Sequence, residues 1–157
     1  VDQLLEPNLN EQGEIVNKGS TAGRIIAWTA AWDIIRDQPF GVGTGDGRNE
    51  LIKSYKEMGA IYNMEHRLNA HNQFLEVGVI VGWFGMLLLF AILFCGLIVA
   101  LKKRDSMFLG FIFVVGINLL FESYLEVQSG ITFVAFFFAL FTKSEFQTNI
   151  QKRSIKV

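Results

Sequence analysis

Hydrophobic residues are concentrated in the second half of the chain. The 25 residues from 77 to 101 contain no charged side chain and no side-chain amide or carboxylate. At the rise of an α-helix they span ~37 Å, which is enough to cross a hydrocarbon core of about 30 Å. The pattern predicts an unbroken transmembrane helix. The polar residues just before it lie where water meets lipid.

Two shorter, mainly apolar runs follow, separated by a polar stretch. Each is short for a full span. We therefore extend them to 106–126 and 130–142 and predict an antiparallel pair of helices with a tight turn near 128–130. A partly re-entrant segment is the alternative. With 77–101, this makes three transmembrane helices, followed by a cytoplasmic tail over 143–157.

The first half of the chain is polar, with hydrophobic residues recurring at helical spacing. A helix capped by Ser20 or Thr21 is predicted to continue until Pro39 stops it. Its two tryptophans suit a helix that lies on a membrane surface or packs on other helices. Residues 48–58 predict a second short helix, and residues 1–19 have the composition of a loop.

Four glycines alternate with other residues at positions 41–47. Glycine permits positive φ and close backbone approach, so a tight turn or an anion-binding nest can form here. The spacing matches neither a P-loop nor a dinucleotide motif, and no strand precedes it. We interpret the run as a structural turn, with a phosphate cradle as the alternative.

The composition is that of a membrane protein with a sizeable polar portion, with 51% hydrophobic residues and a mean hydropathy of +0.34. The net charge of −1 provides no basic surface for nucleic acid. Cys95 is the single cysteine, which excludes an internal disulfide and any CxxC site. The chain starts without methionine or a signal-peptide pattern. We expect an all-α integral membrane protein, the C-terminal part of a polytopic helical bundle.

Basic residues indicate the orientation in the membrane. Lys102, Lys103 and Arg104 form a short basic turn, and the tail carries further lysines and an arginine. By the positive-inside rule, this turn and the C-terminus lie in the cytoplasm. Residues 1–76 then form a helical loop on the periplasmic side of a bacterial inner membrane. Four candidate site residues lie on that side: Arg24, His71, Glu122 and Glu126.

His71 lies within two helical turns of the hydrophobic boundary. Histidine is the side chain whose ordinary pKa is near neutrality. A neutral imidazole here could accept a proton from an attacking sugar hydroxyl, while a neighbouring carboxylate or amide fixes its tautomer. The alternative is an interfacial histidine without a chemical role. His66 is five residues away, which is not the spacing of two ligands on one helix face, and we predict no metal site.

The other candidates are charged. Arg24 has a planar fork of donors suited to phosphate or diphosphate oxygens, with a solvated arginine paired to a carboxylate as the alternative. Glu122 and Glu126 are predicted to lie on one face of a helix, at the end of an apolar run. An ionisable group at such a position costs free energy unless it is hydrated or paired with an opposite charge, which favours a functional role. The alternative is that both simply reach the aqueous interface.

Two motifs resemble those of a known family. His71-Asn72, nine residues and then Gly82-Trp-Phe-Gly85 resemble the signature of bacterial membrane glycosyltransferases related to O-antigen ligases and polymerases. Upstream, Arg24 with Trp28 and the Pro-Phe-Gly-Val-Gly run resemble the arginine-and-tryptophan helix and the Pro-x-Gly-x-Gly turn of that family's periplasmic loop. Both motifs occur in the family's order, and the resemblance covers about residues 20–142.

The resemblance implies transfer of a polyprenyl diphosphate-linked glycan to a sugar hydroxyl, without a cofactor. The acceptor is lipid A-core for a ligase, or another repeat unit for a polymerase. His71 matches the proposed general base and Arg24 an arginine assigned to the donor diphosphate. Asn72, Glu122 and Glu126 are further residues that we predict to bind substrate. A non-catalytic sensor or assembly module that binds a partner, and a transporter fragment, are the alternative functions.

Overall fold

The computed structural model describes residues 20–154, with side chains for residues 21–143, and every regular element in this range is a helix. The predicted all-α class is confirmed for these residues, and the loop predicted for 1–19 lies outside them. In chain order the elements are α1 (Ser20–Asp37), α2 (Gly47–Glu57), α3 (Ile61–Glu65), α4 (Gln73–Lys103), α5 (Ser106–Phe121), the 3₁₀ turn η2 (Tyr124–Glu126) and α6 (Gln128–Ser154).

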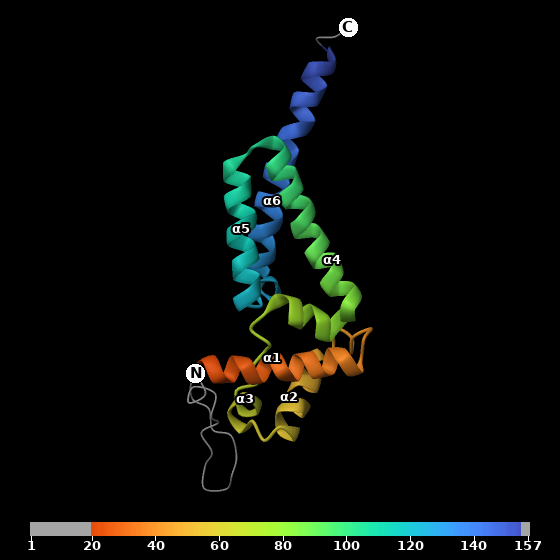
Figure 1. The fold of residues 1–157 in the computed structure, drawn as a ribbon, viewed down its shortest axis with the longest axis vertical. Helices are drawn as coiled ribbons and strands as arrows, with labels where there is room; N and C mark the ends of the chain where they lie inside the picture. The colour runs from red at the N-terminus through yellow and green to blue at the C-terminus, as the bar shows by residue number, and fades with distance from the viewer. Residues whose placement is uncertain (1–19, 155–157) are drawn as a thin grey trace.

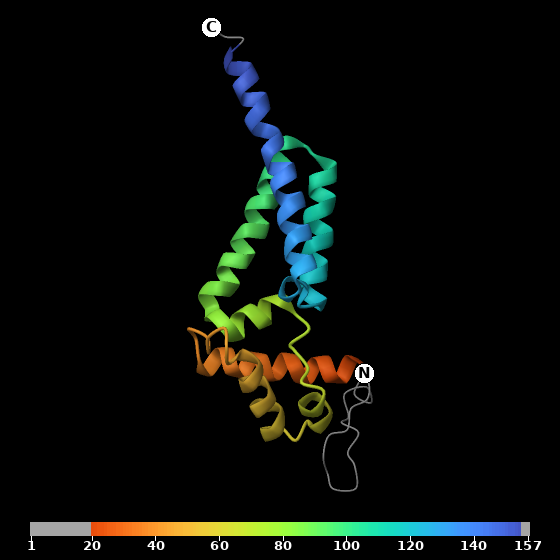
Figure 2. The ribbon, with the colours of Figure 1, turned by 180° about the vertical axis from the view of Figure 1, so that it is seen from behind.

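The helices form two parts, one at the foot of the other (Figure 1). Helices α1, α2 and α3 make a layer in which α1 lies across the foot of the long helices. Helices α4, α5 and α6 run lengthwise away from this layer, and the view from behind shows α6 alongside the other two (Figure 2). The turn between α5 and α6 is at the end of the bundle that faces α1.

The layer is held together by small side chains on one face of α1. Ala27, Ala30 and Ala31 are fully buried and pack in one core with Leu51 and Tyr55 of α2. The spacing of three and four residues places the alanines on the same side of the helix. Their small size allows neighbouring helices to approach closely, so α1 is clamped between α2 and the start of α4.

Helix α4 changes direction at Gly82, which has φ 75° and ψ −164°. This backbone conformation is essentially restricted to glycine. The N–H of Trp83 donates to the carbonyl of Pro39 at 3.0 Å instead of to its own helix. The prediction of an unbroken helix is therefore wrong at this residue. Residues before the kink lie beside α1, and residues 83–103 run lengthwise in the bundle (Figure 1).

The glycine run after Pro39 docks on this kink. The N–H groups of Val42 and Gly43 donate to the carbonyls of Val79 (2.8 Å) and Ile80 (3.0 Å). Gly41 has φ 78°, and a Cβ there would overlap the backbone of α4. These contacts agree with the interpretation of the run as a structural turn, because the loop satisfies carbonyls that the kink leaves without helical partners.

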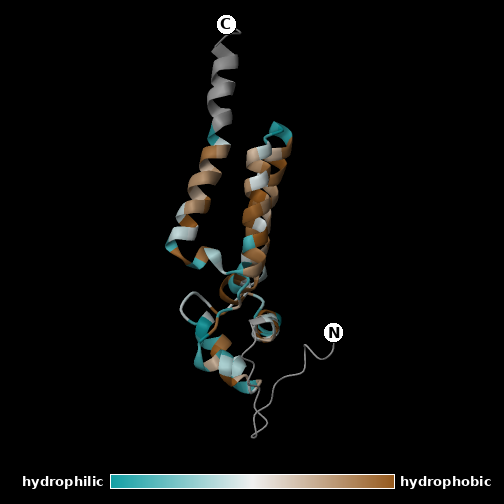
Figure 3. Ribbon diagram, turned by 90° about the vertical axis from the view of Figure 1, so that its left-hand side faces the viewer, coloured by the Kyte–Doolittle hydropathy of each residue, from teal (hydrophilic) through white to brown (hydrophobic). Residues whose placement is uncertain are grey.

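Of the described helices, α4 is the one that is long and apolar enough to cross a membrane, whereas α5 and residues Gln128–Lys143 of α6 are shorter. After the kink, residues 83–103 would extend ~31 Å, about the thickness of a hydrocarbon core. Hydrophobic residues dominate the lengthwise helices (Figure 3), and many of their large side chains are exposed. Such a surface suits contact with lipid or with other apolar helices.

Helices α5 and α6 form an antiparallel pair, as predicted. Phe108 in the first turn of α5 stacks on Phe141 with ring centroids 5.2 Å apart, and Phe111 contacts Phe133, which lies earlier in α6. Asp105 begins α5 by accepting hydrogen bonds from the N–H groups of residues 107 and 108, both at 3.0 Å. This capping separates α5 from α4 at the basic turn.

The polar turn after α5 differs from the prediction. Helix α5 ends at Phe121 rather than at residue 126, and α6 already begins at Gln128, so the turn occupies 122–127. Glu122 is extended, with φ −145° and ψ 148°, and Glu126 ends η2. The prediction that the two glutamates share one helix face is therefore wrong. Polar groups at the start of α4 bind backbone atoms of residues 120 and 125, which fixes this stretch as a turn.

Candidate functional site

The segment that carries His71 is bound to the turn after α5. Each residue from 69 to 73 takes part in a hydrogen bond, and four of these bonds reach residues 120–126. The four join Asn69 to Glu126, His71 to Glu122, Asn72 to Leu120 and Gln73 to Leu125. The site therefore lies where the start of α4 meets the end of α5, at the foot of the bundle.

His71 is held in an uncommon conformation with its ring directed at a carboxylate. Its φ is 46°, in the left-handed region that costs a non-glycine residue about 1 kcal/mol or more. Its Nδ1–H donates to Oε2 of Glu122 at 3.3 Å, and the side chain is 28% exposed. A carboxylate on Nδ1 fixes the tautomer in which Nε2 carries a lone pair. The sequence predicted a carboxylate or amide neighbour for His71, and in the structure this neighbour is the carboxylate of Glu122.

Arg24 reaches the same carboxylate from α1. Its Nη2 donates to Oε1 of Glu122 at 2.8 Å, while Oε2 of Glu122 accepts from His71. Groups from three distant parts of the chain thus meet at one side chain. All three side chains are partly exposed, so a ligand can reach them. Arg24, His71 and Glu122 lie together, as the predicted site requires.

Asn72 is the N-cap of α4. Its Oδ1 accepts from the N–H groups of Phe74 (2.9 Å) and Leu75 (3.1 Å), and its Nδ2 donates to the carbonyl of Leu120 at 3.0 Å. Both polar atoms of this amide therefore have partners inside the protein. The observed role is to start α4 and tie it to α5, and the predicted contact with substrate stays a prediction.

Glu126 contacts Asn69, two residues before His71, and lies near a second arginine, Arg48. Its Oε2 accepts from Nδ2 of Asn69 at 3.1 Å, and Nη2 of Arg48 is 3.8 Å away. The sequence does not point to Arg48, because nothing local distinguishes an exposed arginine at the start of a polar helix. Arg48 becomes part of the site only through the packing of α2 on the rest of the layer.

Glu76 is a buried carboxyl group directly behind the site, in the part of α4 that precedes the kink. It is 2% exposed, and its Oε2 accepts from the N–H of Ala70 at 3.0 Å. Burial raises the pKa of Glu76 to about 7, the Ala70 N–H and Arg48 act to lower it, and the neighbouring Glu126 acts to raise it. The sequence places Glu76 among polar residues at the helix mouth and gives no sign of its burial.

Carboxylates and histidines could also suggest a metal centre. Within the described residues, no group of three or more His, Cys, Asp or Glu side chains lies close enough to hold a metal ion. The carboxylates of Glu122 and Glu126 instead contact arginine, histidine and asparagine. The observed chemistry of the site is that of an imidazole, two glutamates and two guanidinium groups.

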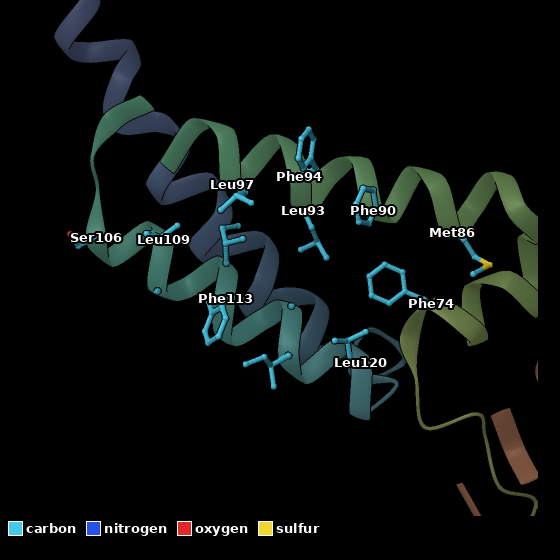
Figure 4. A pocket seen from close by; sticks show the side chains of 14 residues that line it. Phe74, Met86, Phe90, Leu93, Phe94, Leu97, Ser106, Leu109, Phe113 and Leu120 are labelled. Atoms are coloured by element: carbon cyan, nitrogen blue, oxygen red, sulfur yellow. The ribbon is translucent and has the colours of Figure 1, made fainter. Parts of the chain in front are cut away.

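An apolar groove of about 960 Å³ runs between α4 and α5 (Figure 4). Its lining is almost entirely hydrophobic and extends from Ser106, at the basic turn, to Phe74 and Leu120. Leu120 accepts the hydrogen bond from Asn72, the neighbour of His71. One end of the groove therefore lies beside the polar site.

In the part of the chain that the structure describes, the regular elements are all helices, one of them is long and apolar enough to cross a membrane, and a His–Glu–Arg site lies at the foot of that helix. Residues 5–90, more than half of the chain, match the family model described as O-antigen ligase. The chain belongs to the O-antigen ligase family, which confirms the resemblance in the sequence. The match includes Arg24 and His71 and ends within α4. Neither the curated proteins nor the solved structures gave a match.

Proposed function

We propose that this protein transfers a glycan from a polyprenyl diphosphate carrier to a sugar hydroxyl of lipid A-core, in lipopolysaccharide assembly. Membership of the O-antigen ligase family supports this type of function. The observation that carries the chemical assignment is the shared carboxylate: Arg24 and His71 bind the two oxygens of Glu122. A base and an anion-binding group are thereby held within reach of one small ligand.

In the proposed reaction, Nε2 of His71 takes the proton of the acceptor hydroxyl as its oxygen attacks the anomeric carbon of the glycan. The bond from that carbon to the diphosphate oxygen breaks, and the diphosphate leaves with the electron pair. Glu122 keeps the imidazole oriented and stabilises it once it is protonated. Such base assistance is typically worth about 10²–10⁴-fold in rate.

Arg24 stabilises the leaving diphosphate in this proposal. A guanidinium has five N–H donors, and Nη2 is the Arg24 nitrogen that contacts Glu122. The other donors can bind phosphate oxygens, whose negative charge increases as the bond to the glycan breaks. Stabilisation of this kind contributes a few kcal/mol, about 3 for a well-placed donor. We assign Glu126 and Asn72 to the edge of the substrate site, where they also hold the His71 segment.

The lipid carrier fits the apolar groove between α4 and α5. The groove is lined by hydrophobic side chains and ends at Phe74 and Leu120, next to the polar site (Figure 4). An isoprenoid chain lying there would place an attached diphosphate near Arg24. The groove volume of about 960 Å³ accommodates part of such a chain, and the remainder would extend into lipid.

We further propose that the site faces the periplasm of a bacterial inner membrane. The basic turn after α4 lies at the end of the bundle opposite the layer of α1, α2 and α3 and the turn between α5 and α6 (Figure 1). If the positive-inside rule places that turn in the cytoplasm, the layer of α1, α2 and α3 lies on the outer face. In this topology residues 1–76 form the periplasmic loop, the apolar parts of α4, α5 and α6 that follow are membrane helices of a multi-pass protein, and 143–157 is the cytoplasmic tail.

The test is His71→Ala in the complete gene product, expressed in cells that lack the chromosomal copy. Loss of the base is expected to reduce polymer-bearing lipopolysaccharide on a gel at least about 100-fold. His66→Ala is the matched control, because His66 is exposed and stacks on Tyr62 away from Glu122. An unchanged ladder for His71→Ala, at an equal protein level, would remove His71 from the mechanism.

A further inference from the structure

Two carboxyl groups meet behind the His71 segment. Glu76, near the start of α4, and Glu126, at the end of η2, lie close enough for Glu126 to act on the pKa of Glu76. Glu76 is almost completely buried. Two ionised carboxylates in contact repel each other, and burial makes the repulsion stronger. Protonation of Glu76 removes this repulsion, and the proposed reaction makes no use of Glu76.

Both carboxyl groups bind the residues that directly precede His71. Glu76 accepts the N–H of Ala70 at 3.0 Å, and Glu126 accepts Nδ2 of Asn69 at 3.1 Å. His71 itself has a left-handed backbone, which persists only where the surrounding structure holds it. These two bonds therefore contribute to holding the backbone that directs the imidazole.

We infer that Glu76 is the positioning residue of His71. In its protonated form Glu76 donates to Glu126, while its other oxygen accepts the N–H of Ala70. The segment 69–71 is then fixed so that the imidazole stays on Glu122. Once Glu76 ionises, the two carboxylates repel each other and the segment loses this support. This inference rests on the proposed function, which assigns the catalytic role to His71.

The groups that face Glu76 support its protonation near neutral pH. Burial is the main cause that raises the pKa of Glu76 to about 7, and Glu126 acts in the same direction. Arg48 of α2 and the Ala70 N–H oppose it. Tyr55, also from α2, remains neutral because burial, with a smaller effect from Glu76, raises its own pKa. Among these groups, Glu76 is therefore the one that changes charge near neutral pH.

The experiment is the pH profile of glycan transfer by the complete protein in proteoliposomes, for wild type and for Glu76→Gln. Wild type is expected to lose activity as the pH rises, roughly fivefold between pH 7 and pH 8, as the protonated fraction falls. Glu76→Gln is expected to keep its activity across that interval. Its amide can donate to Glu126 and accept from Ala70 at every pH. Glu57→Gln, an exposed glutamate of α2, is the matched control and should retain the wild-type profile.

Infrared spectroscopy of the same samples provides a readout that needs no activity. A protonated carboxyl band should titrate near neutral pH in wild type and be missing in Glu76→Gln. Persistence of the alkaline loss or of the band in Glu76→Gln would overturn the inference, as would failure of this variant to accumulate in membranes. If His71→Ala keeps full activity, the proposed function fails. If His71→Ala loses activity but Glu76→Gln has the same pH profile as wild type, the proposed function stands and the positioning role fails.

Discussion

At the scale of residues, the site is organised by one carboxylate. Glu122 binds Arg24 at 2.8 Å and His71 at 3.3 Å, so each side chain constrains the other through a shared partner. A carboxylate between an imidazole and a guanidinium orients the first and offsets the charge of the second. A change at Arg24 should therefore affect both the binding of a diphosphate and the orientation of His71.

Arg24→Lys tests this arrangement. Lysine keeps the charge but lacks the planar fork, so it cannot hold Glu122 and phosphate oxygens at the same time. We expect transfer to fall about tenfold or more, equivalent to ~1.4 kcal/mol of transition-state stabilisation. The measurement is kcat/KM with a lipid-linked glycan donor. Arg36→Lys is the control on the same helix, since Arg36 is largely exposed and pairs locally with Asp33. Equal losses in both variants would contradict the role of Arg24.

Residue type and the expected membrane topology grouped His71, Arg24 and Glu122 as candidates on one side of the membrane, and the structure brings these three side chains into contact. Residue type and topology could not show that Glu122 connects the other two, because Arg24 and Glu122 are 98 positions apart and only the packing of α1 under the bundle brings them together. Glu76 was missed for a related reason. A carboxylate in the first turn of a helix ordinarily faces water, and its burial here depends on α2 and η2.

At the scale of elements, the loop after α1 and the kink in α4 depend on each other. The loop carbonyl of Pro39 accepts the N–H of Trp83, while the loop N–H groups bind carbonyls that precede the kink. Gly82 is required twice in this contact, for its backbone conformation and for the space beside Pro39. The joint directs the first part of α4 along α1 and thereby places Glu76 behind the site.

Gly82→Ala should break this joint. A Cβ at Gly82 would overlap the carbonyl oxygen of Pro39, and alanine is strained at φ 75°. We expect a loss of about 2 kcal/mol or more in the free energy of unfolding, measured by thermal melting in detergent, and reduced transfer activity. Gly45→Ala is the control, because a Cβ there meets no atom within 4 Å. A melting temperature equal to wild type in Gly82→Ala would show that the loop does not hold the kink.

Helical periodicity predicted α1, α2 and the antiparallel α5–α6 pair, since these patterns are local. It failed at Gly82 because a glycine inside an apolar run also fits an unbroken helix, and the kink is set by a loop some 40 residues earlier. It failed at residues 122–126 for the same reason. The composition allows a helix to continue there, whereas the bond from Gln73 to the N–H of Leu125 fixes a turn.

At the scale of the whole molecule, the layer and the bundle meet around the buried Glu76. The layer is a polar platform with its own core, and the bundle exposes large apolar side chains along its length. The N–H of Ala70 donates to this glutamate, and Arg48 of α2 and Glu126 of η2 both act on its pKa. Because the junction contains a carboxyl group that favours its protonated form, the stability of the folded chain should depend on pH.

The sign of this dependence follows from the pKa of Glu76, which burial raises from 4.5 to about 7. Between these values the folded state keeps a proton that the unfolded state releases, so the free energy of unfolding falls as the pH rises. The loss should be on the order of 3 kcal/mol in total, and it should level off above pH 7. Glu76→Gln cannot ionise, so the difference in melting temperature between this variant and wild type should grow from pH 4.5 to pH 7. Parallel melting curves over this interval would show that Glu76 does not hold its proton more tightly in the folded protein.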